Sequence, residues 1–273
     1  MPVSIRFLGT AAFEIVAAGG QHILIDPYLD DNPVSPVKVA DLERVDLLLV
    51  THAAVDHLGD AEAILRRFPE LPLICGADVR GYLMHRGIDG ERLRAVPWGM
   101  TVEEAGVRVR PVESRHWSYI QTGADEPGGI RAFSGTPLGY IVYAGEGQRI
   151  YDSGDTAIFS DLKLIGELYE PTVALLNVGV PREHRGAAHG VSTYLTGEMD
   201  AREAAIATEW LGTQYVIPCH HDDPTLPEIV QFRELVTQAC MLDGDAPRPI
   251  VLSPGERMVL HEGNTRAYRP EHM

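Results

Sequence analysis

A cluster of side chains that commonly bind metals follows a strongly apolar segment in the first quarter of the chain. Residues 46–50 read Asp-Leu-Leu-Leu-Val, and His52, Asp56 and His57 come shortly after them. Imidazole nitrogens and carboxylate oxygens are ligands that zinc and related transition metals prefer, and a short turn can aim several of them at one point. The segment therefore predicts a metal-binding loop at the end of a buried strand.

Three further side chains of the same kinds also follow predicted strands. They are His116, Asp155 and His220, and Gly154 before Asp155 allows the backbone to turn tightly. A single histidine after a strand is more often a surface or hydrogen-bonded core residue than a ligand. Strand ends at one edge of a sheet nevertheless bring together residues that are distant in sequence, so the complete series predicts one composite metal site.

The order of the expected strands and helices indicates the fold class. Strands are expected at residues 3–8, 13–17, 22–25, 46–50, 71–75, 107–112, 139–143, 149–151, 173–178 and 215–218, with a closing strand pair at 250–252 and 257–260. Helices are expected at residues 60–68, 77–86, 159–169, 199–211 and 226–240. Strand-rich parts alternate with mixed α/β parts, which predicts a single α/β domain over residues 1–273, a four-layer αββα sandwich.

Composition narrows the range of partners and compartments. The formal net charge is −16, from 23 basic and 39 acidic residues, so nucleic acid and anionic membranes are disfavoured and a small-molecule substrate is expected. Three cysteines offer no disulfide framework, and the first residues lack the features of a secretory signal. No apolar run approaches the roughly 18 residues of a membrane span, so we expect a cytoplasmic protein, with homo-oligomerisation left open.

The loop and the later ligands together resemble the ligand series of the metallo-β-lactamase superfamily. The loop of that superfamily reads His-x-His-x-Asp-His, and Ala54 stands here at the position of the second His. Further segments resemble, more narrowly, a bacterial group of metal-dependent hydrolases related to the L-ascorbate-6-phosphate lactonases; they are residues 23–29, 32–33, 58–61, 154–156, 163–169 and 216–220. The resemblance implies the metallo-β-lactamase-type fold, a scaffold that hosts many different reactions.

The resemblance also implies two adjacent metal positions. His52, residue 54 and His116 would hold the first metal, Asp56, His57 and His220 would hold the second, and Asp155 would bridge the two. Because Ala54 supplies no ligand, the first position is expected to be weak. The other ligands suffice for one divalent transition metal at the second position, with Zn²⁺ expected first, Mn²⁺ or Fe²⁺ as alternatives, and two metals per chain left open.

The functional prediction that results is a metal-dependent hydrolase. A metal-activated water would attack a small-molecule ester, lactone, amide or phosphodiester, and Asp155 or Asp56 would orient that water and transfer its proton. Two alternatives stay open. His52, His116 and Asp155 form the two-histidine, one-carboxylate set of mononuclear non-haem iron oxygenases, and the ligand missing at position 54 is also compatible with a catalytically impaired member of the fold.

Three other features bear on the predicted site. Asp26 precedes a proline and is expected to bond loop amides or a ligand histidine rather than the metal. Residues 117–137 and 181–198 are long for connections without regular structure, and we expect them to be lids or interfaces. His184 or His189 in the second of these segments would be able to replace the missing imidazole, although a solvated loop is the simpler interpretation.

Overall fold

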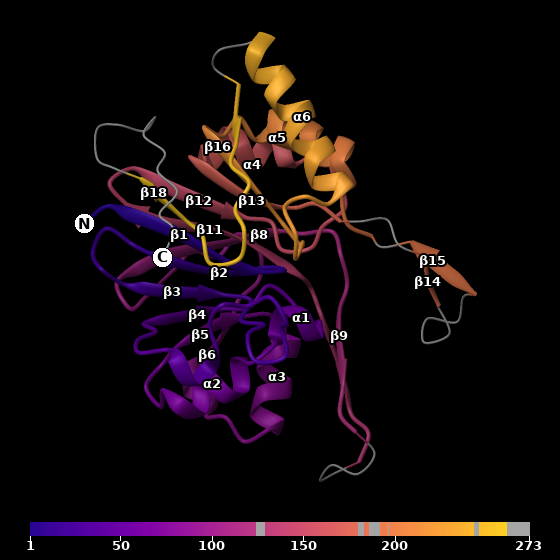
Figure 1. Cartoon of the computed structure of the whole chain (residues 1–273). Helices are drawn as coiled ribbons and strands as arrows, with labels where there is room; N and C mark the ends of the chain where they lie inside the picture. The colour runs from indigo at the N-terminus through magenta and orange to yellow at the C-terminus, as the bar shows by residue number, and fades with distance from the viewer. Residues whose placement is uncertain (124–128, 180–182, 186–191, 196, 243–245, 261–273) are drawn as a thin grey trace.

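Two seven-stranded sheets lie face to face at the centre of the molecule (Figure 1). The computed structural model describes residues 1–123, 129–179, 183–185, 192–195, 197–242 and 246–260. The first sheet has the order β18-β1-β2-β3-β4-β5-β6, and the second has the order β17-β16-β13-β12-β11-β8-β7. Each sheet joins an antiparallel part to a parallel part, because β3 to β6 are parallel in the first sheet and β12, β13, β16 and β17 are parallel in the second.

The strands have the following bounds. In the first sheet they are β1 (Val3–Gly9), β2 (Ala12–Val16), β3 (His22–Ile25), β4 (Leu47–Leu49), β5 (Leu73–Cys75), β6 (Leu93–Ala95) and β18 (Arg257–Leu260). In the second sheet they are β7 (Val102–Glu104), β8 (Val107–Glu113), β11 (Leu138–Gly145), β12 (Gln148–Asp152), β13 (Val173–Asn177), β16 (Tyr215–Cys219) and β17 (Arg248–Pro249).

Helices cover the outer face of each sheet (Figure 1). The helices on the first sheet are α1 (Val55–Leu58), α2 (Ala61–Arg67) and α3 (Ala77–His85), and those on the second are α4 (Leu162–Tyr169), α5 (Ala201–Leu211) and α6 (Pro227–Leu242). Two short 3₁₀ helices, Val39–Asp41 and Gly90–Arg92, lie in connections. The observed order of layers is helix, sheet, sheet, helix, which confirms the predicted four-layer fold.

Burial follows directly from this layering. Phe7 and Phe13 of the first sheet and Tyr140 and Val142 of the second belong to one fully buried cluster between the sheets. Strand β4 is buried at every position because the other sheet covers one face and helices cover the other, which explains its continuous leucine sequence. No helix within the described ranges has both the length and the apolar character needed to cross a membrane.

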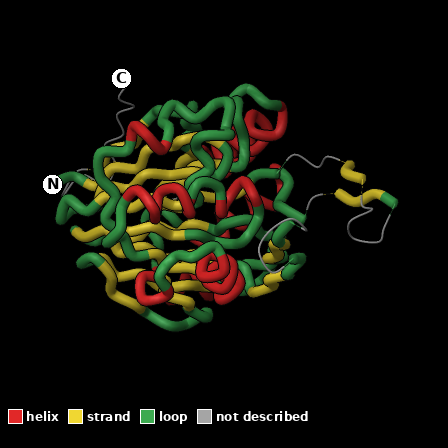
Figure 2. The backbone as a smooth tube through the Cα atoms, turned by 90° about the horizontal axis from the view of Figure 1, so that it is seen from below, coloured by secondary structure: helices red, strands yellow, loops and turns green. Residues whose placement is uncertain are grey.

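Two hairpins extend from the sandwich, in the two segments that were expected to be connections without regular structure. Residues 117–137, expected to lack regular structure, contain β9 (Ser118–Gln121) paired with β10 (Ala132–Gly135). Phe133 of β10 packs against Tyr82 of α3, with ring centroids 6.0 Å apart. The second segment contains β14 (Glu183–Arg185) paired with β15 (Thr193–Leu195), and this hairpin lies away from both sheets (Figure 2).

The predicted closing strand pair is wrong. Residues 250–252 are not a strand, and β18 pairs with β1 of the first sheet, whereas β17 pairs with β16 of the second. Ile250 and Leu252 are both buried between the sheets, and the Ile250 amide donates a hydrogen bond to the Val216 carbonyl. The alternating apolar residues at 250–252 correctly predicted that this segment is buried. The same pattern does not indicate which strand a segment pairs with.

A buried tyrosine links the two sheets and provides a stability prediction. The Tyr140 hydroxyl on β11 donates a 2.7 Å hydrogen bond to the Val50 carbonyl, at the end of β4 in the opposite sheet. Tyr140→Phe leaves that carbonyl without this buried donor, and we expect the free energy of unfolding to fall by about 1–3 kcal/mol. Chemical denaturation measures the loss. Tyr143→Phe, on the same strand but only partly buried on the outer face, is the matched control, and equal losses would contradict the role of Tyr140.

Candidate metal centre

The metal-binding loop begins at a buried carboxylate at the end of β3. Asp26 Oδ1 accepts a 2.8 Å hydrogen bond from the Thr51 amide, and Asp26 Oδ2 accepts a 2.6 Å hydrogen bond from the Thr51 hydroxyl. Asp26 adopts a left-handed backbone conformation with φ of 46°, which is strained for a residue other than glycine. Asp26 therefore ties Thr51, the first residue of the loop, to the end of the neighbouring strand β3. Hydrogen bonds from loop amides to Asp26 are what the sequence predicts.

The same carboxylate fixes which ring nitrogen of His57 faces the site. Asp26 Oδ2 lies 2.6 Å from His57 Nδ1, so Nδ1 carries the proton and Nε2 points the other way. The hydroxyl of Thr51 gives its one proton to Asp26 and therefore accepts from His52 Nδ1, which lies 3.1 Å away. Both histidines consequently present Nε2 to the site, the arrangement that metal ligation requires.

The second sheet supplies Asp155 and His116 through loops that are bonded to each other. The Ser114 hydroxyl donates to the Asp155 carbonyl at 2.6 Å, and the Thr156 hydroxyl accepts from the Arg115 amide at 2.9 Å. Gly154 before Asp155 has a φ of 54°, and a Cβ there would lie 2.9 Å from the Leu138 carbonyl oxygen. Only glycine therefore allows this turn to bring the Asp155 carboxylate against the first sheet.

His220 comes from the end of β16, and a strained backbone aims it. Its φ is 67°, and its amide donates a 2.6 Å hydrogen bond to the carbonyl of Thr10, whose own φ is 55°. The Thr10 amide in turn donates to the His221 carbonyl at 3.1 Å. This reciprocal bridge between the ends of β1 and β16 fixes the backbone of His220, whose Nε2 lies 3.4 Å from Asp155 Oδ2. His221 points elsewhere and packs against Phe7, with ring centroids 5.0 Å apart.

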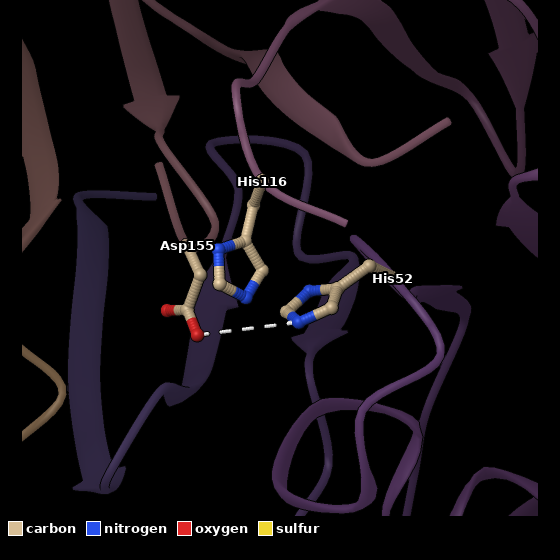
Figure 3. A group of neighbouring side chains, drawn as sticks. All are labelled: His52, His116 and Asp155. Atoms are coloured by element: carbon tan, nitrogen blue, oxygen red, sulfur yellow. Dashed lines mark ion pairs between the residues drawn. The ribbon is translucent and has the colours of Figure 1, made fainter. Parts of the chain in front are cut away.

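All six predicted ligands meet at one place. His52, His116 and Asp155 form one group (Figure 3) and Asp56, His57 and His220 form another, each with ligand atoms within 4.8 Å of one another. Asp155 Oδ2 lies between the groups, at 3.1 Å from His57 Nε2, 3.4 Å from His220 Nε2 and 4.0 Å from His52 Nε2. Asp56 Oδ2 lies 3.4 Å from His220 Nε2.

The ligand atoms at the centre of this cluster have the chemistry expected of a metal site. Four buried polar atoms make no hydrogen bond to any described residue; they are Nε2 of His52, His57 and His220 and Oδ1 of Asp155. Buried polar atoms are normally hydrogen-bonded, so a convergent set of unpaired nitrogen and oxygen atoms needs an explanation. A divalent transition metal prefers this mixture of imidazole and carboxylate donors, and the residues present therefore fit such an ion.

The electrostatics prepare most of these groups for ligation. Burial would raise the pKa of Asp155, but the positive charges of His220 and His57 outweigh it and hold that pKa well below its usual range. Burial lowers the pKa of His52 and of His116, so both rings are neutral near pH 7 and free to ligate. Burial also opposes protonation of His57, yet the carboxylates of Asp155 and Asp26 raise its pKa, so metal binding there must release a proton.

One acidic residue at the site was not predicted. Glu198 offers a carboxylate oxygen within 4.8 Å of ligand atoms of Asp155 and His220. In the sequence it stands just before a predicted helix, where a glutamate usually has a capping or solvated role, so no sequence signal marks it. His184 lies in β14, whose side chains are not described, and His189 lies outside the described residues. Neither prediction about a replacement histidine is therefore tested.

A cavity of about 420 Å³ lies beside the loop, and Ala54 lines it together with Val55, Tyr82 and Tyr119. Ala54 itself is the residue before the first turn of α1 and is partly buried. Cys219, next to His220, is buried between the sheets, and burial raises the pKa of its thiol well above the usual value. This cysteine is therefore a core residue and is not poised to be a nucleophile.

Comparison with known proteins agrees with the fold. Residues 21–221 match the family described as the beta-lactamase superfamily domain. A UPF0173 metal-dependent hydrolase from Rubrobacter xylanophilus is 35% identical over 255 residues, covering 93% of this chain and 95% of the relative. Another from Methanopyrus kandleri is 38% identical over 252 residues, covering 92% of this chain and 97% of the relative. The chain is thus a metal-dependent hydrolase of the metallo-β-lactamase superfamily. Within it, the chain belongs to the UPF0173 family.

Solved structures show how widely this fold is used. Igni18, a metallo hydrolase from Ignicoccus hospitalis, superposes with a TM-score of 0.73 at 27% identity, covering 96% of this chain and 99% of that chain. CmlA, a diiron β-hydroxylase from Streptomyces venezuelae, has a TM-score of 0.65 at 16% identity, covering 95% of this chain and 54% of that chain. The second likeness is one of fold alone, so the chemistry must be inferred from the residues of the site.

The contact between Asp26 and His57 leads to a prediction about metal affinity. Asp26→Asn removes the charge that orients the His57 ring, and loss of such a partner should weaken metal binding by about 10–100-fold. Competition with a chromophoric chelator measures the affinity. Asp152→Asn is the control, because burial raises the pKa of Asp152 to about 8 and the side chain, protonated at pH 7, closely matches an amide. Equal affinities of Asp26→Asn and the wild type would contradict the orienting role.

Proposed function

We propose that this chain hydrolyses a small-molecule ester, lactone, amide or phosphodiester with one resident divalent transition metal, Zn²⁺ in the first place. The supporting observation is the convergence of six candidate ligand side chains, with Asp155 between the other five. Four ligand atoms of this set are buried without a hydrogen bond to the described residues. Asp56, His57 and His220 would hold the metal together with Asp155. When bound, such a metal lowers the pKa of a water molecule and polarises the oxygen under attack.

The protein groups around that position have separate tasks in this proposal. Asp155 Oδ2 faces His57 and His220, whereas Oδ1 is free to hold the proton of an attacking water. Asp56 is only partly buried. Burial would raise its pKa, but a hydrogen bond from His220 and the charge of His57 outweigh this and hold the pKa below the usual value, so Asp56 is an anion at the edge of the site. Asp26 keeps the His57 ring in the ligating tautomer.

A single metal is proposed because of Ala54. The first group keeps His52, His116 and Asp155, but a methyl group stands where the superfamily motif has a third imidazole. A position with fewer ligands holds its metal less tightly, so the second position is expected to fill first. Ala54 also lines the cavity of about 420 Å³ beside the loop, but none of the six candidate ligands is among the residues that line it.

One alternative has a structural observation in its favour. The imidazoles of His52 and His116 and the carboxylate of Asp155 form a compact two-histidine, one-carboxylate group (Figure 3), which is the ligand type of mononuclear iron oxygenases. CmlA, with the same fold, is a diiron hydroxylase. Hydrolysis needs no oxygen, so the two reactions are separable by measuring oxygen uptake. The UPF0173 relatives carry the name of hydrolases, and hydrolysis is accordingly preferred.

Metal content tests the proposed centre. Protein purified without chelator and loaded with Zn²⁺ or Mn²⁺ should contain close to one metal ion per chain by plasma spectrometry, because one position keeps its full ligand set. Asp155→Ala and His220→Ala should each lose this ion. His221→Phe is the control, since it removes a neighbouring imidazole but keeps a ring against Phe7. Retention of the metal by both alanine variants would place the centre elsewhere, and oxygen uptake with a thiol substrate would favour the oxygenase.

Ala54→His tests the assignment of the first position. An imidazole at this place should join His52 and His116, raise the metal content toward two ions per chain and accelerate hydrolysis of a panel of lactones and esters. Val55→His is the control, because Val55 is the adjacent residue and its side chain is 79% exposed. Unchanged metal content with slower hydrolysis would contradict the assignment and would indicate that the space beside Ala54 belongs to the working site.

A further inference from the structure

Glu198 is a buried carboxylate that the proposed centre does not yet include. Its side chain is only 8% exposed, and it lies two residues before Asp200, the N-cap of α5. The Asp200 carboxylate accepts hydrogen bonds from the Arg202 and Glu203 amides, which fixes the start of that helix. The backbone around Glu198 is therefore held by a well-capped helix on its C-terminal side.

The end of β13 holds the same segment from the other side. The Gly179 amide donates a 2.8 Å hydrogen bond to the carbonyl of Met199, the residue after Glu198. A Cβ at Gly179 would lie 2.5 Å from Glu198 Oε2 and 2.7 Å from Glu198 Cβ. Because such distances are too short for real carbon atoms, only glycine at this position leaves room for the Glu198 side chain.

Glu198 faces Nδ1 of His220, the ring nitrogen that is not directed at Asp56 and Asp155. Glu198 Oε2 lies 3.4 Å from His220 Nδ1, whereas His220 Nε2 faces Asp56 and Asp155, each at 3.4 Å. The two nitrogens of one ring are thus directed at different carboxylates. The arrangement parallels that of His57, whose Nδ1 faces Asp26 while Nε2 faces Asp155.

We propose that Glu198 is a positioning residue that holds His220 with Nδ1 protonated and Nε2 directed to the metal. The inference rests on the proposed metal position formed by Asp56, His57, Asp155 and His220. A carboxylate on the distal nitrogen fixes the tautomer and orientation of a ligand histidine and makes the ring a stronger donor. The backbone of His220 is fixed by its bond to Thr10, but that bond does not restrain rotation of the ring, and Glu198 supplies this restraint.

The two ligand histidines of the second position would then be oriented by the two halves of the molecule. Asp26 follows β3 of the first sheet and restrains His57, while Glu198 precedes α5 on the second sheet and restrains His220. The same geometry also fits direct ligation of the metal by Glu198, since Glu198, Asp155 and His220 have ligand atoms within 4.8 Å of one another. Direct ligation by Glu198 is therefore a distinct outcome that the experiment must separate from positioning.

The experiment compares metal affinity in full-length variants. Zn²⁺ affinity is measured by chelator competition for the wild type, Glu198→Ala, Glu198→Gln and Gly179→Ala. Loss of the carboxylate should weaken binding by about 10–100-fold in Glu198→Ala, and Glu198→Gln should recover part of the loss because its amide oxygen still accepts a hydrogen bond. Gly179→Ala should resemble Glu198→Ala, because the new methyl group displaces the carboxylate. Glu203→Ala, which loosens the α5 cap without facing His220, should bind as the wild type does.

The absorption spectrum of the Co²⁺-loaded protein separates positioning from direct ligation. Positioning predicts that the ligand-field bands of Glu198→Ala keep the wild-type shape and intensity at saturating Co²⁺, because the atoms bound to the metal are the same. A changed intensity would show that Glu198 is itself a ligand and would overturn the positioning role. Unchanged Zn²⁺ affinity in Glu198→Ala would overturn it as well. A wild-type chain that binds neither metal would instead refute the centre on which the inference depends.

Discussion

The site depends on one buried interaction, the contact of the Asp26 carboxylate with Thr51 and His57. Asp26 accepts two hydrogen bonds from Thr51 and lies 2.6 Å from His57 Nδ1, so one side chain fixes both the start of the loop and the tautomer of a ligand. The Thr51 hydroxyl also bonds to His52 Nδ1 and so fixes the tautomer of this second histidine. Pairing of these buried polar groups makes the network stable, and the network in turn holds Asp26 in its strained, left-handed backbone conformation.

The candidate site is composite, because each of the two sheets carries part of the ligand set. The first sheet presents the loop that carries His52, Asp56 and His57, and the second sheet presents Asp155 and His220 opposite it. Left-handed backbone at Thr10, Asp26 and His220 collects around the place where the sheets meet. Strain concentrated in this way persists only where surrounding structure holds it, and it supports a functional role for the region.

The sequence predicted features that are local and failed for those that depend on tertiary contacts. Strands His22–Ile25 and Arg257–Leu260 were expected with their observed bounds, because alternation and flanking turn residues define them. The six candidate ligands, whose role stays a prediction, were placed near one another because the segments that carry them follow strand ends. The β9–β10 hairpin was missed because long polar connections contain no clear strand period, and the closing pair was wrong because burial does not specify the neighbouring strand. Glu198 was missed because its partners are Gly179 and His220, which only the fold brings close.

Anomalous diffraction from crystals of the Zn²⁺-loaded protein tests the central claim most directly, because it locates the metal without reference to activity. We expect one strong peak among His57 Nε2, His220 Nε2 and the carboxylates of Asp56 and Asp155, with His57 Nδ1 still on Asp26. A strong peak at His52 and His116 with none at His57 would contradict the preferred position. Absence of any peak in this cluster from fully loaded protein would refute the metal centre.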